Sequence, residues 1–281
     1  MHLYSYLLIV FFCFANAFTN TIKKVAAPAA PQPTPPQTDG FCGIRNTSFR
    51  GGEQLSFEVY YSVIGAYIFA GDATFTCVNE QLNGKAIYHI EGVGNSNPRY
   101  DNIFKVRDKY ESWVDTTTFL PIKFNRQVSE GKFKKTEQIA FNHAAKYAQS
   151  TTKKIPISAC MQDVLSATYY ARNINFSKLA VGDKVSFSMV LDDAVFDMYI
   201  KYLGVQKIKT KFGKFNAIKF KPLLLKGTIF EGGENMTVFI SNDANHLPLR
   251  VESPIVIGSV KIDMMEYKNI RYPLTSLISA N

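Results

Sequence analysis

The chain is poor in the residues that most often carry enzyme chemistry. It has 4 cysteines, 4 histidines and 1 tryptophan among 281 residues, and no cysteine or histidine pair has metal-ligand spacing. His89, His143 and His246 lack a serine, cysteine or acid placed as in a nucleophile motif. The glycines form neither a phosphate-binding loop nor a dinucleotide fingerprint. We therefore expect a protein that is not an enzyme and that holds no metal and no cofactor.

The sequence also lacks an apolar run long enough to cross a membrane as a helix. The apolar run 7–14 is too short to span a bilayer. It leads into Ala15-Asn16-Ala17, the small-x-small pattern of a cleavage site, so residues 1–17 are predicted to be a signal peptide. The alternative is a lipoprotein with an acylated Cys13, which Phe11-Phe12 disfavours. We expect export to the periplasm or cell envelope, with secretion as the other outcome.

Residues 18–40 contain little that can form a core. Prolines and alanines dominate residues 26–36, which predicts an extended linker, either a plain spacer or a tether. The rest of the chain, 41–281, is predicted to be a single β-rich domain. A hydrophobic content of 46%, with 14% aromatic residues, is enough for a sizeable core.

Cysteine is too rare for a disulfide-dense scaffold. Cleavage after Ala17 leaves Cys42, Cys77 and Cys160. Cys77 lies in an alternating strand, where a lone cysteine is usually a small buried hydrophobe. Cys42 and Cys160 lie in irregular segments, so we predict that these two form a disulfide.

Most of the domain alternates between apolar and polar residues, as β-strands do, and the pattern occurs twice. Residues 52–57 match 182–187 in register, and Leu-Pro turns at Pro121 and Pro248 each precede a hairpin glycine by the same spacing. This predicts two related halves, about 51–145 and 180–272. The predicted fold is all-β and mainly antiparallel: a curved sheet or half-open β-barrel built from two similar β-meanders with one short central helix.

The one clear helix signal lies between these halves, at residues 163–173. Asp163 is a good N-cap, and Leu165 and Tyr169 fall on one helical face. Arg172, near the C-terminal end, has two interpretations. The favoured one is a cation that interacts with the helix dipole; the other is a buried ion pair with a carboxylate such as Glu111.

Several motifs resemble the bacterial family called domain of unknown function 3108. They are Gly52-Glu53-x-Leu55-x-Phe57-x-Val59, Arg107-Asp108-x-x-Glu111-Ser112, Leu120-Pro121 and Gln162-Asp163-Val164-Leu165-Ser166-x-x-Tyr169-Tyr170-x-Arg172. The resemblance covers about residues 50–272. It implies export and a fold, but no reaction.

The Leu-Pro turn is also similar to that of periplasmic lipoprotein carriers of the LolA type. These carriers are half-open β-barrels with an apolar hollow plugged by helices. Together with the aromatic richness, this resemblance implies a ligand-binding inner face. The candidate ligand-binding residues are Tyr61, Tyr67, Phe69, Trp113, Phe124, Tyr169 and Arg172.

The formal net charge of +9 suggests an anionic partner. Lysines alternate with apolar residues on a predicted hairpin and would form a face for anionic membrane or glycan: Lys207, Lys209, Lys211, Lys219 and Lys221. An exported chain without a recognition helix is not expected to bind nucleic acid. We expect a carrier of a lipid, an acylated protein or another hydrophobic ligand. A structural or interaction module with a packed core is the alternative, and an envelope hydrolase is the least favoured.

Overall fold

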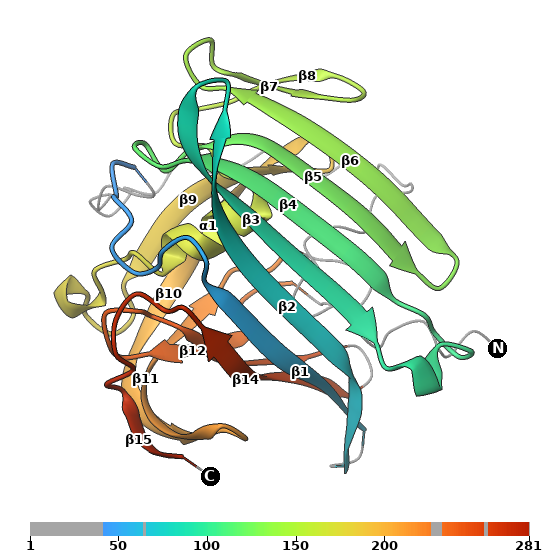
Figure 1. Ribbon diagram of the computed structural model, residues 1–281, viewed down its shortest axis with the longest axis vertical. Helices are drawn as coiled ribbons and strands as arrows, with labels where there is room; N and C mark the ends of the chain where they lie inside the picture. Colours follow the sequence, from blue (N-terminus) through green and yellow to red (C-terminus); the bar gives the residue numbers. More distant parts are fainter. Residues whose placement is uncertain (1–41, 64–65, 226–231, 256–257, 281) are drawn as a thin grey trace, which may run out of the picture.

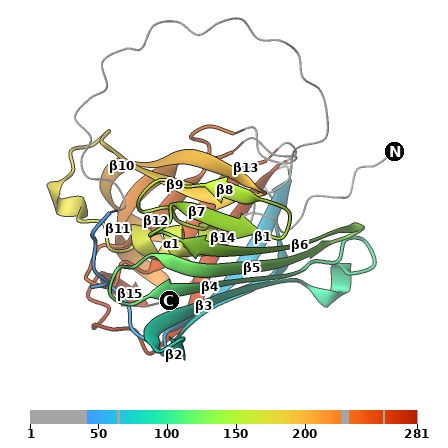
Figure 2. The same ribbon diagram turned by 90° about the horizontal axis from the view of Figure 1, so that it is seen from above.

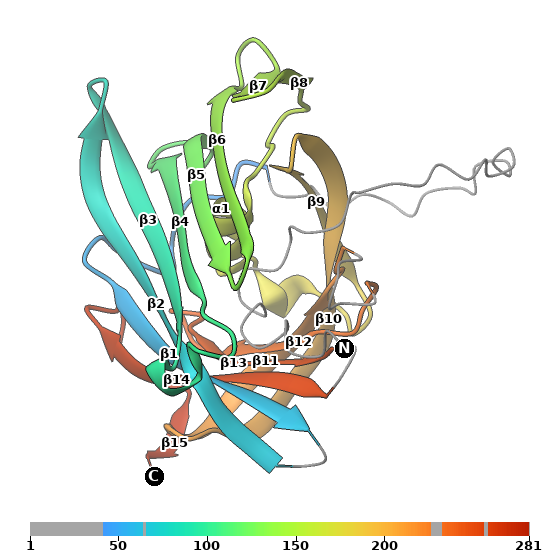
Figure 3. The same ribbon diagram turned by 90° about the vertical axis from the view of Figure 1, so that its right-hand side faces the viewer.

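A single bent sheet wraps around one helix in the computed structural model (Figure 1). The structure describes residues 42–63, 66–225, 232–255 and 258–280, so the predicted signal peptide and linker lie outside the described residues. In these ranges, 15 strands belong to one antiparallel sheet, and the helix is α1 (Val164–Ala171). The sheet curls into a half-open barrel, which Figure 3 shows end-on with α1 inside it. The predicted all-β fold is confirmed.

The first half of the sheet is a meander in which consecutive strands pair. Its strands are β1 (Gln54–Val63), β2 (Ala66–Leu82), β3 (Lys85–Ser96), β4 (Arg107–Asp115), β5 (Pro121–Glu130), β6 (Phe133–Asn142), β7 (Tyr147–Ser150) and β8 (Lys154–Pro156). Asn83 and Gly84 turn β2 into β3 with φ angles of 52° and 76°, which suits the positive φ of a type I′ turn. A short 3₁₀ helix, η1 (Pro98–Tyr100), lies between β3 and β4.

The second half is another meander, and it joins the first through β14 and β1. Its strands are β9 (Lys184–Leu191), β10 (Ala194–Lys209), β11 (Gly213–Pro222), β12 (Thr237–Ser241), β13 (Pro248–Pro254) and β14 (Ser259–Lys268), with β15 (Leu277–Ala280) paired to β11. A 3₁₀ helix, η2 (Phe176–Lys178), precedes β9. The strand path ends at β8 and β9, which do not pair with each other. Seen from above, the two halves face each other across α1 (Figure 2).

The two Leu-Pro turns occupy matching places in the two meanders. Pro121 begins β5 and Pro248 begins β13, which is the fifth strand of each half. The pairing register shifts opposite each proline, between Trp113 and Val114 in one half and within β12 in the other. Such a shift bends the strand locally. The internal duplication stays a prediction, and this correspondence favours it.

The backbone of the two turns is also alike. Phe119 and His246, each two residues before the proline, have φ angles of 58° and 46°. Each turn is closed by a backbone hydrogen bond to the carbonyl of the leucine, from Asp115 N at 3.0 Å and from Ser241 N at 2.8 Å. Both turns therefore close on the leucine carbonyl before the proline, although the second turn is one residue longer.

Helix α1 begins where the sequence predicts. The Asp163 carboxylate accepts hydrogen bonds from the backbone N–H groups of Leu165 at 2.8 Å and Ser166 at 2.9 Å, and Asp163 N donates to Ser166 Oγ. This capping box satisfies donors that the first turn leaves unpaired. Ser112 Oγ on β4 also donates to Asp163, at 2.6 Å. Burial raises the pKa of Asp163 to about 6. The cap thus fixes the helix to the first half of the sheet.

The predicted disulfide is present between Cys42 and Cys160, and Cys77 is a free, fully buried thiol. The bridge joins the segment before β1 to the segment before α1. Among the described residues, no helix combines the length and apolar character needed to cross a membrane.

Removing the disulfide should destabilise the domain. The bridge spans 118 residues, so its loss restores conformational freedom to a long loop of the unfolded chain. We expect Cys42→Ser/Cys160→Ser to lower the free energy of unfolding by up to about 4 kcal/mol, measured by urea denaturation. Dithiothreitol should lower the stability of the wild type and leave the variant unchanged. Equal sensitivity of both proteins to dithiothreitol would contradict this assignment.

Candidate functional site

A buried ion pair joins α1 to the start of the first half. Arg172, the C-cap of α1, donates to both carboxylate oxygens of Glu53, from Nη1 at 2.6 Å and from Nη2 at 2.9 Å. Both side chains are at most 3% exposed. The guanidinium lies 5.3 Å from the ring centre of Phe49 and 5.2 Å from that of Tyr169. Two parallel charge-assisted hydrogen bonds and aromatic contacts compensate for the loss of water around the pair.

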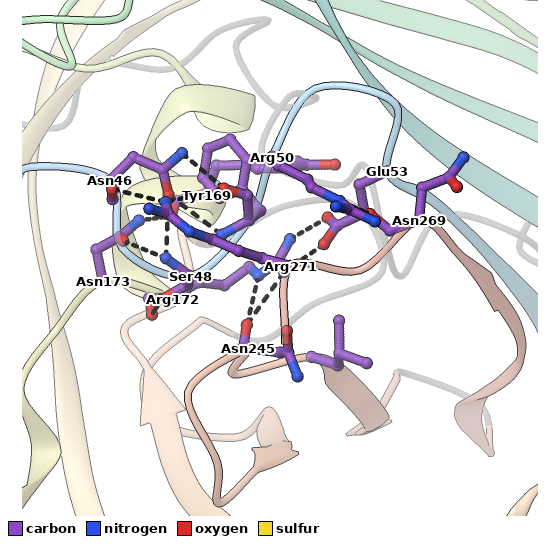
Figure 4. A network of polar contacts seen from close by, with 12 residues as sticks. Asn46, Ser48, Arg50, Glu53, Tyr169, Arg172, Asn173, Asn245, Asn269 and Arg271 are labelled. Carbon is purple, nitrogen blue, oxygen red and sulfur yellow. Dashed lines mark hydrogen bonds and ion pairs between the residues drawn. The ribbon is translucent and has the colours of Figure 1, made fainter. Parts of the chain in front are cut away.

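A polar network extends this pair to the Leu-Pro turn of the second half (Figure 4). Arg172 Nη2 donates to the carbonyl of Asn245 at 3.1 Å. The backbone carbonyl of Arg172 accepts from Ser48 Oγ and His246 Nδ1, each at 2.6 Å. Asn173 Oδ1 accepts from Ser48 N at 3.1 Å. Segments from both halves and from the helix therefore meet at one arginine.

Arg172 corrects an expectation from the sequence. The sequence favours the dipole interpretation over a buried pair, and for a buried pair it suggests Glu111 as the partner. Arg172 is in fact in a buried pair, with Glu53. Glu111 lies on the outward face of β4, 3.1 Å from Lys109. His246, in the same Leu-Pro turn as Asn245, is half-buried; burial lowers its pKa, and its ring packs edge-on against Phe176.

An apolar cavity lies between α1 and the inner face of the second half. Its volume is about 120 Å³, and its lining includes Ala167 of α1, Phe187 and Met189 of β9, Ile200 of β10 and Val238 of β12. An engineered apolar cavity of ~150 Å³ in another protein stays dry and binds benzene. The cavity therefore has room for a short apolar group rather than for several acyl chains.

The few polar groups in the lining have partners within the protein. Thr168 Oγ1 donates to the carbonyl of Val164 at 2.8 Å, and Arg172 is held by Glu53 and Asn245. A ligand would consequently contact a lining that is almost entirely hydrocarbon. Such a lining selects for apolar character and shape and offers little to recognise a polar head group.

A second polar cluster lies across the gap between the two ends of the sheet. Arg126 of β5 points inward and is only 1% exposed. It contacts Asp192 in the β9–β10 turn, and its Nε lies 2.8 Å from Glu137 of β6. Lys135 also contacts Asp192, and Thr152 contacts the neighbouring Asp193. These contacts hold β9 to the first half where the strands do not pair.

Two carboxyl groups meet beside Arg126. Asp108 and Glu130 share a hydrogen bond, and Asp108 also accepts from Ser129 N at 2.9 Å. Burial, followed by the charge of Asp108, raises the pKa of Glu130 to about 8; burial also raises the pKa of Asp108. One proton shared by the pair avoids two like charges in a dry site. Among the described residues, no group of three or more metal-ligating side chains forms a metal site.

The predicted ligand-binding residues do not form one surface. Phe124 and Tyr169 are buried in the core, and Tyr61 is half-buried on β1. Tyr67 and Phe69 are exposed near the β1–β2 turn. Their ligand-binding roles stay predictions.

Trp113 and Arg172 complete the predicted set, and they lie on different faces. Trp113 lies on the outward face of β4, stacked on His89 with 4.5 Å between ring centres, and Lys123 lies over it. Arg172 is the member of the set that borders the cavity. Apolar–polar alternation along a strand does not show which of its two faces becomes the inner face of the barrel.

The five predicted lysines are not equally exposed. Lys207, Lys209 and Lys211 are exposed, whereas Lys219 and Lys221 are half-buried. Lys211 lies over the ring of Tyr60 and 3.7 Å from Glu58. Part of this charge is therefore already paired within the protein.

Sequence reasoning missed the inward-facing charges and most of the cavity lining. Arg126 had a usable signal, since it alternates with Phe124 and Val128 on the buried face of β5. Asp108 likewise alternates with Tyr110 on β4. The cavity lining had no such signal, because its apolar residues look like ordinary core.

Comparison with known proteins gives a family and a fold. A family model described as protein of unknown function (DUF3108) matches residues 56–265. The crystal structure of a β-barrel-like protein of domain of unknown function DUF1849 from Brucella abortus has a TM-score of 0.51 at 7% identity, covering 82% of this chain and 100% of that one. A protein with a YmcC-like fold from Bacteroides fragilis has a TM-score of 0.36 at 10% identity, covering 80% and 99%. No curated protein matches the chain.

Breaking the Glu53–Arg172 pair should destabilise the whole domain. Arg172→Met leaves a buried carboxylate without its cation, so we expect a loss of about 3–5 kcal/mol in the free energy of unfolding, measured with urea. Glu53→Gln/Arg172→Met should lose less than the sum of the single changes. Lys268→Met, which removes a surface pair with Glu266, is the control and should change stability little. Additive single and double effects would show that the two side chains are not coupled.

The Asp108–Glu130 pair should make stability fall with rising pH. The pKa of Glu130 is raised from 4.5 to about 8, so the folded state is favoured while the group is protonated. That advantage is lost as the pH rises through about 8. Relative to Glu130→Gln, the wild type should lose on the order of 2–4 kcal/mol between pH 5 and pH 9, measured by denaturation at each pH. Parallel stability curves for the two proteins would contradict the assignment.

Proposed function

We propose that this chain, which belongs to the DUF3108 family of proteins of unknown function, is an exported, non-catalytic protein that binds one apolar group in the cavity beside α1. The bound group would be a single acyl-chain segment or a hydrocarbon of similar size. The observation that carries this proposal is the apolar lining between α1 and strands β9 to β13.

The chemistry of the lining supports an apolar ligand over a polar one. A polar ligand would leave its hydrogen-bonding groups without partners, because Thr168 and Arg172 already bond within the protein. Unpaired polar groups in a dry site cost free energy. An acyl chain has no such groups, and its transfer from water into the cavity is favourable by about 0.8 kcal/mol for each buried methylene.

Two further features support export to the cell envelope. The Cys42–Cys160 disulfide is of a kind that persists in oxidising compartments. The sequence of residues 1–17 has the pattern of a signal peptide. Both fit a protein that works outside the cytoplasm.

A structural or interaction module is the second candidate. The observation that favours it is the dense packing between α1 and the first half of the sheet, where Phe49, Phe119, Phe124 and Tyr170 are all 0% exposed. On this view the interior serves stability only, and the cavity would remain empty.

Filling the cavity should abolish ligand binding without unfolding the protein. Ala167→Leu and Ala167→Phe place progressively more side chain in the cavity, so the Kd of a fluorescent fatty-acid probe should rise in that order, by about tenfold or more for phenylalanine. Val205→Phe adds the same ring at an exposed position of β10 and is the matched control. Circular dichroism melting verifies folding. If the Kd of the probe is the same in both Ala167 variants as in the wild type, or if the wild type does not bind the probe, the structural module would be favoured.

A further inference from the structure

Exposed apolar side chains gather at one end of the barrel. Strands β1, β3 and β5 run toward this end, so the start of β2, the β3–β4 connection and the β5–β6 turn lie there. Figure 3 looks onto this end. We call the following residues the apolar rim: Tyr67, Ile68, Phe69, Ile103 and Phe133. Large apolar side chains grouped on a surface commonly mark an interaction site.

The β1–β2 hairpin projects beyond the barrel. Tyr67, Ile68 and Phe69 are 53%, 44% and 36% exposed, and they are consecutive. Neighbouring residues of a strand point to opposite faces of the sheet. Consecutive exposure therefore means that both faces of the hairpin are largely open here, although Lys261 lies over the Tyr67 ring and Phe69 packs against Tyr60. The next residue, Ala70, is fully buried.

The next two turns form one continuous surface. Gly131 N donates to the carbonyl of Lys105 at 2.8 Å, which joins the β5–β6 turn to the β3–β4 connection. Ile103 on one of these turns is 61% exposed, and Phe133 on the other is 39% exposed. Neither residue covers the other, so both remain accessible to a partner.

Positive charge surrounds these apolar residues. The exposed cations on the two turns are Arg99, Lys105, Lys132 and Lys134, and none of them forms an ion pair with a carboxylate in the described parts of the chain. The acids there are neutralised or buried: Asp101 pairs with Arg107 at 2.6 Å, and Glu130 is 6% exposed. The surface is therefore apolar and basic at once.

We propose that the apolar rim docks on an anionic lipid surface. Phe133, Ile103 and the hairpin side chains would enter the head-group region, and the surrounding lysines would contact lipid phosphates. Apolar side chains interleaved with lysine are the combination that holds peripheral proteins at membranes. This inference does not rest on the cavity, which is lined by other residues.

Charge favours a lipid surface over a second copy of the chain. A symmetric dimer built on this face would bring Lys132 and Lys134 of one copy against the same cluster of the other. Like charges held close together repel, whereas lipid phosphates are complementary to them. The observed charges therefore favour an anionic bilayer as the partner of this surface.

Vesicle co-sedimentation tests the proposal with the purified protein. The wild type should bind vesicles of phosphatidylcholine with 30 mol% phosphatidylglycerol, and binding should weaken in high salt and on phosphatidylcholine alone. Lys132→Glu/Lys134→Glu should weaken binding by about tenfold or more, since each basic residue near an anionic surface contributes on the order of 1 kcal/mol. Ile103→Ser/Phe133→Ser should weaken it at both salt concentrations.

Matched variants at the other end of the barrel provide the controls. Lys85→Glu/Lys178→Glu makes the same charge change at the β2–β3 turn and in η2, and Val78→Ser removes an exposed apolar residue from β2. Both should bind vesicles like the wild type, and so should Ala167→Phe. If the rim variants and the control variants lose vesicle binding to the same extent, the proposal would be overturned. A dimer in size-exclusion chromatography that Ile103→Ser/Phe133→Ser dissociates would also overturn it, by assigning this face to a second copy.

Discussion

The arrangement of α1 and the two halves of the sheet depends on one buried guanidinium group, that of Arg172. Arg172 lies at the end of α1, and its only carboxylate partner among the described residues is Glu53, at the start of β1. The remaining donors bond to the carbonyl of Asn245, in the turn between β12 and β13. Because a buried cation without its partners is costly, these three segments must come together in one arrangement. The ion pair thereby sets the position of the helix relative to both halves of the sheet.

The distribution of polar groups in the interior follows from this constraint. The Glu53–Arg172 network fixes one side of the barrel, and the Arg126–Asp192 contacts hold the gap between β9 and the first half. Between them, the inner face of the second half is left with apolar residues such as Met189 and Val238, against which α1 packs incompletely. The polar contacts that define the barrel are thus separate from the surface that would receive a ligand.

Local signals in the sequence predicted much of this architecture. The Asp163 cap, the positive-φ turn at Asn83-Gly84 and the Leu-Pro turns depend on neighbouring residues, so a single sequence contains them. The partner of Arg172 lies 119 residues away, and its identity depends on how the sheet curls. Apolar–polar alternation shows which residues of a strand share a face, but not which way the sheet curves. For that reason the sequence predicts Trp113 on the inner face and does not identify the lining of the cavity.

Hydrogen exchange followed by mass spectrometry tests most directly whether one ion pair holds the three segments together. In Glu53→Gln, the amides of β1, of α1 and of residues 242–247 should lose protection to the same extent, because all three depend on Arg172. The hairpin between β2 and β3 should keep its protection until global unfolding. Loss of protection confined to residues 50–55 would show that the helix and the second half are positioned independently of this pair.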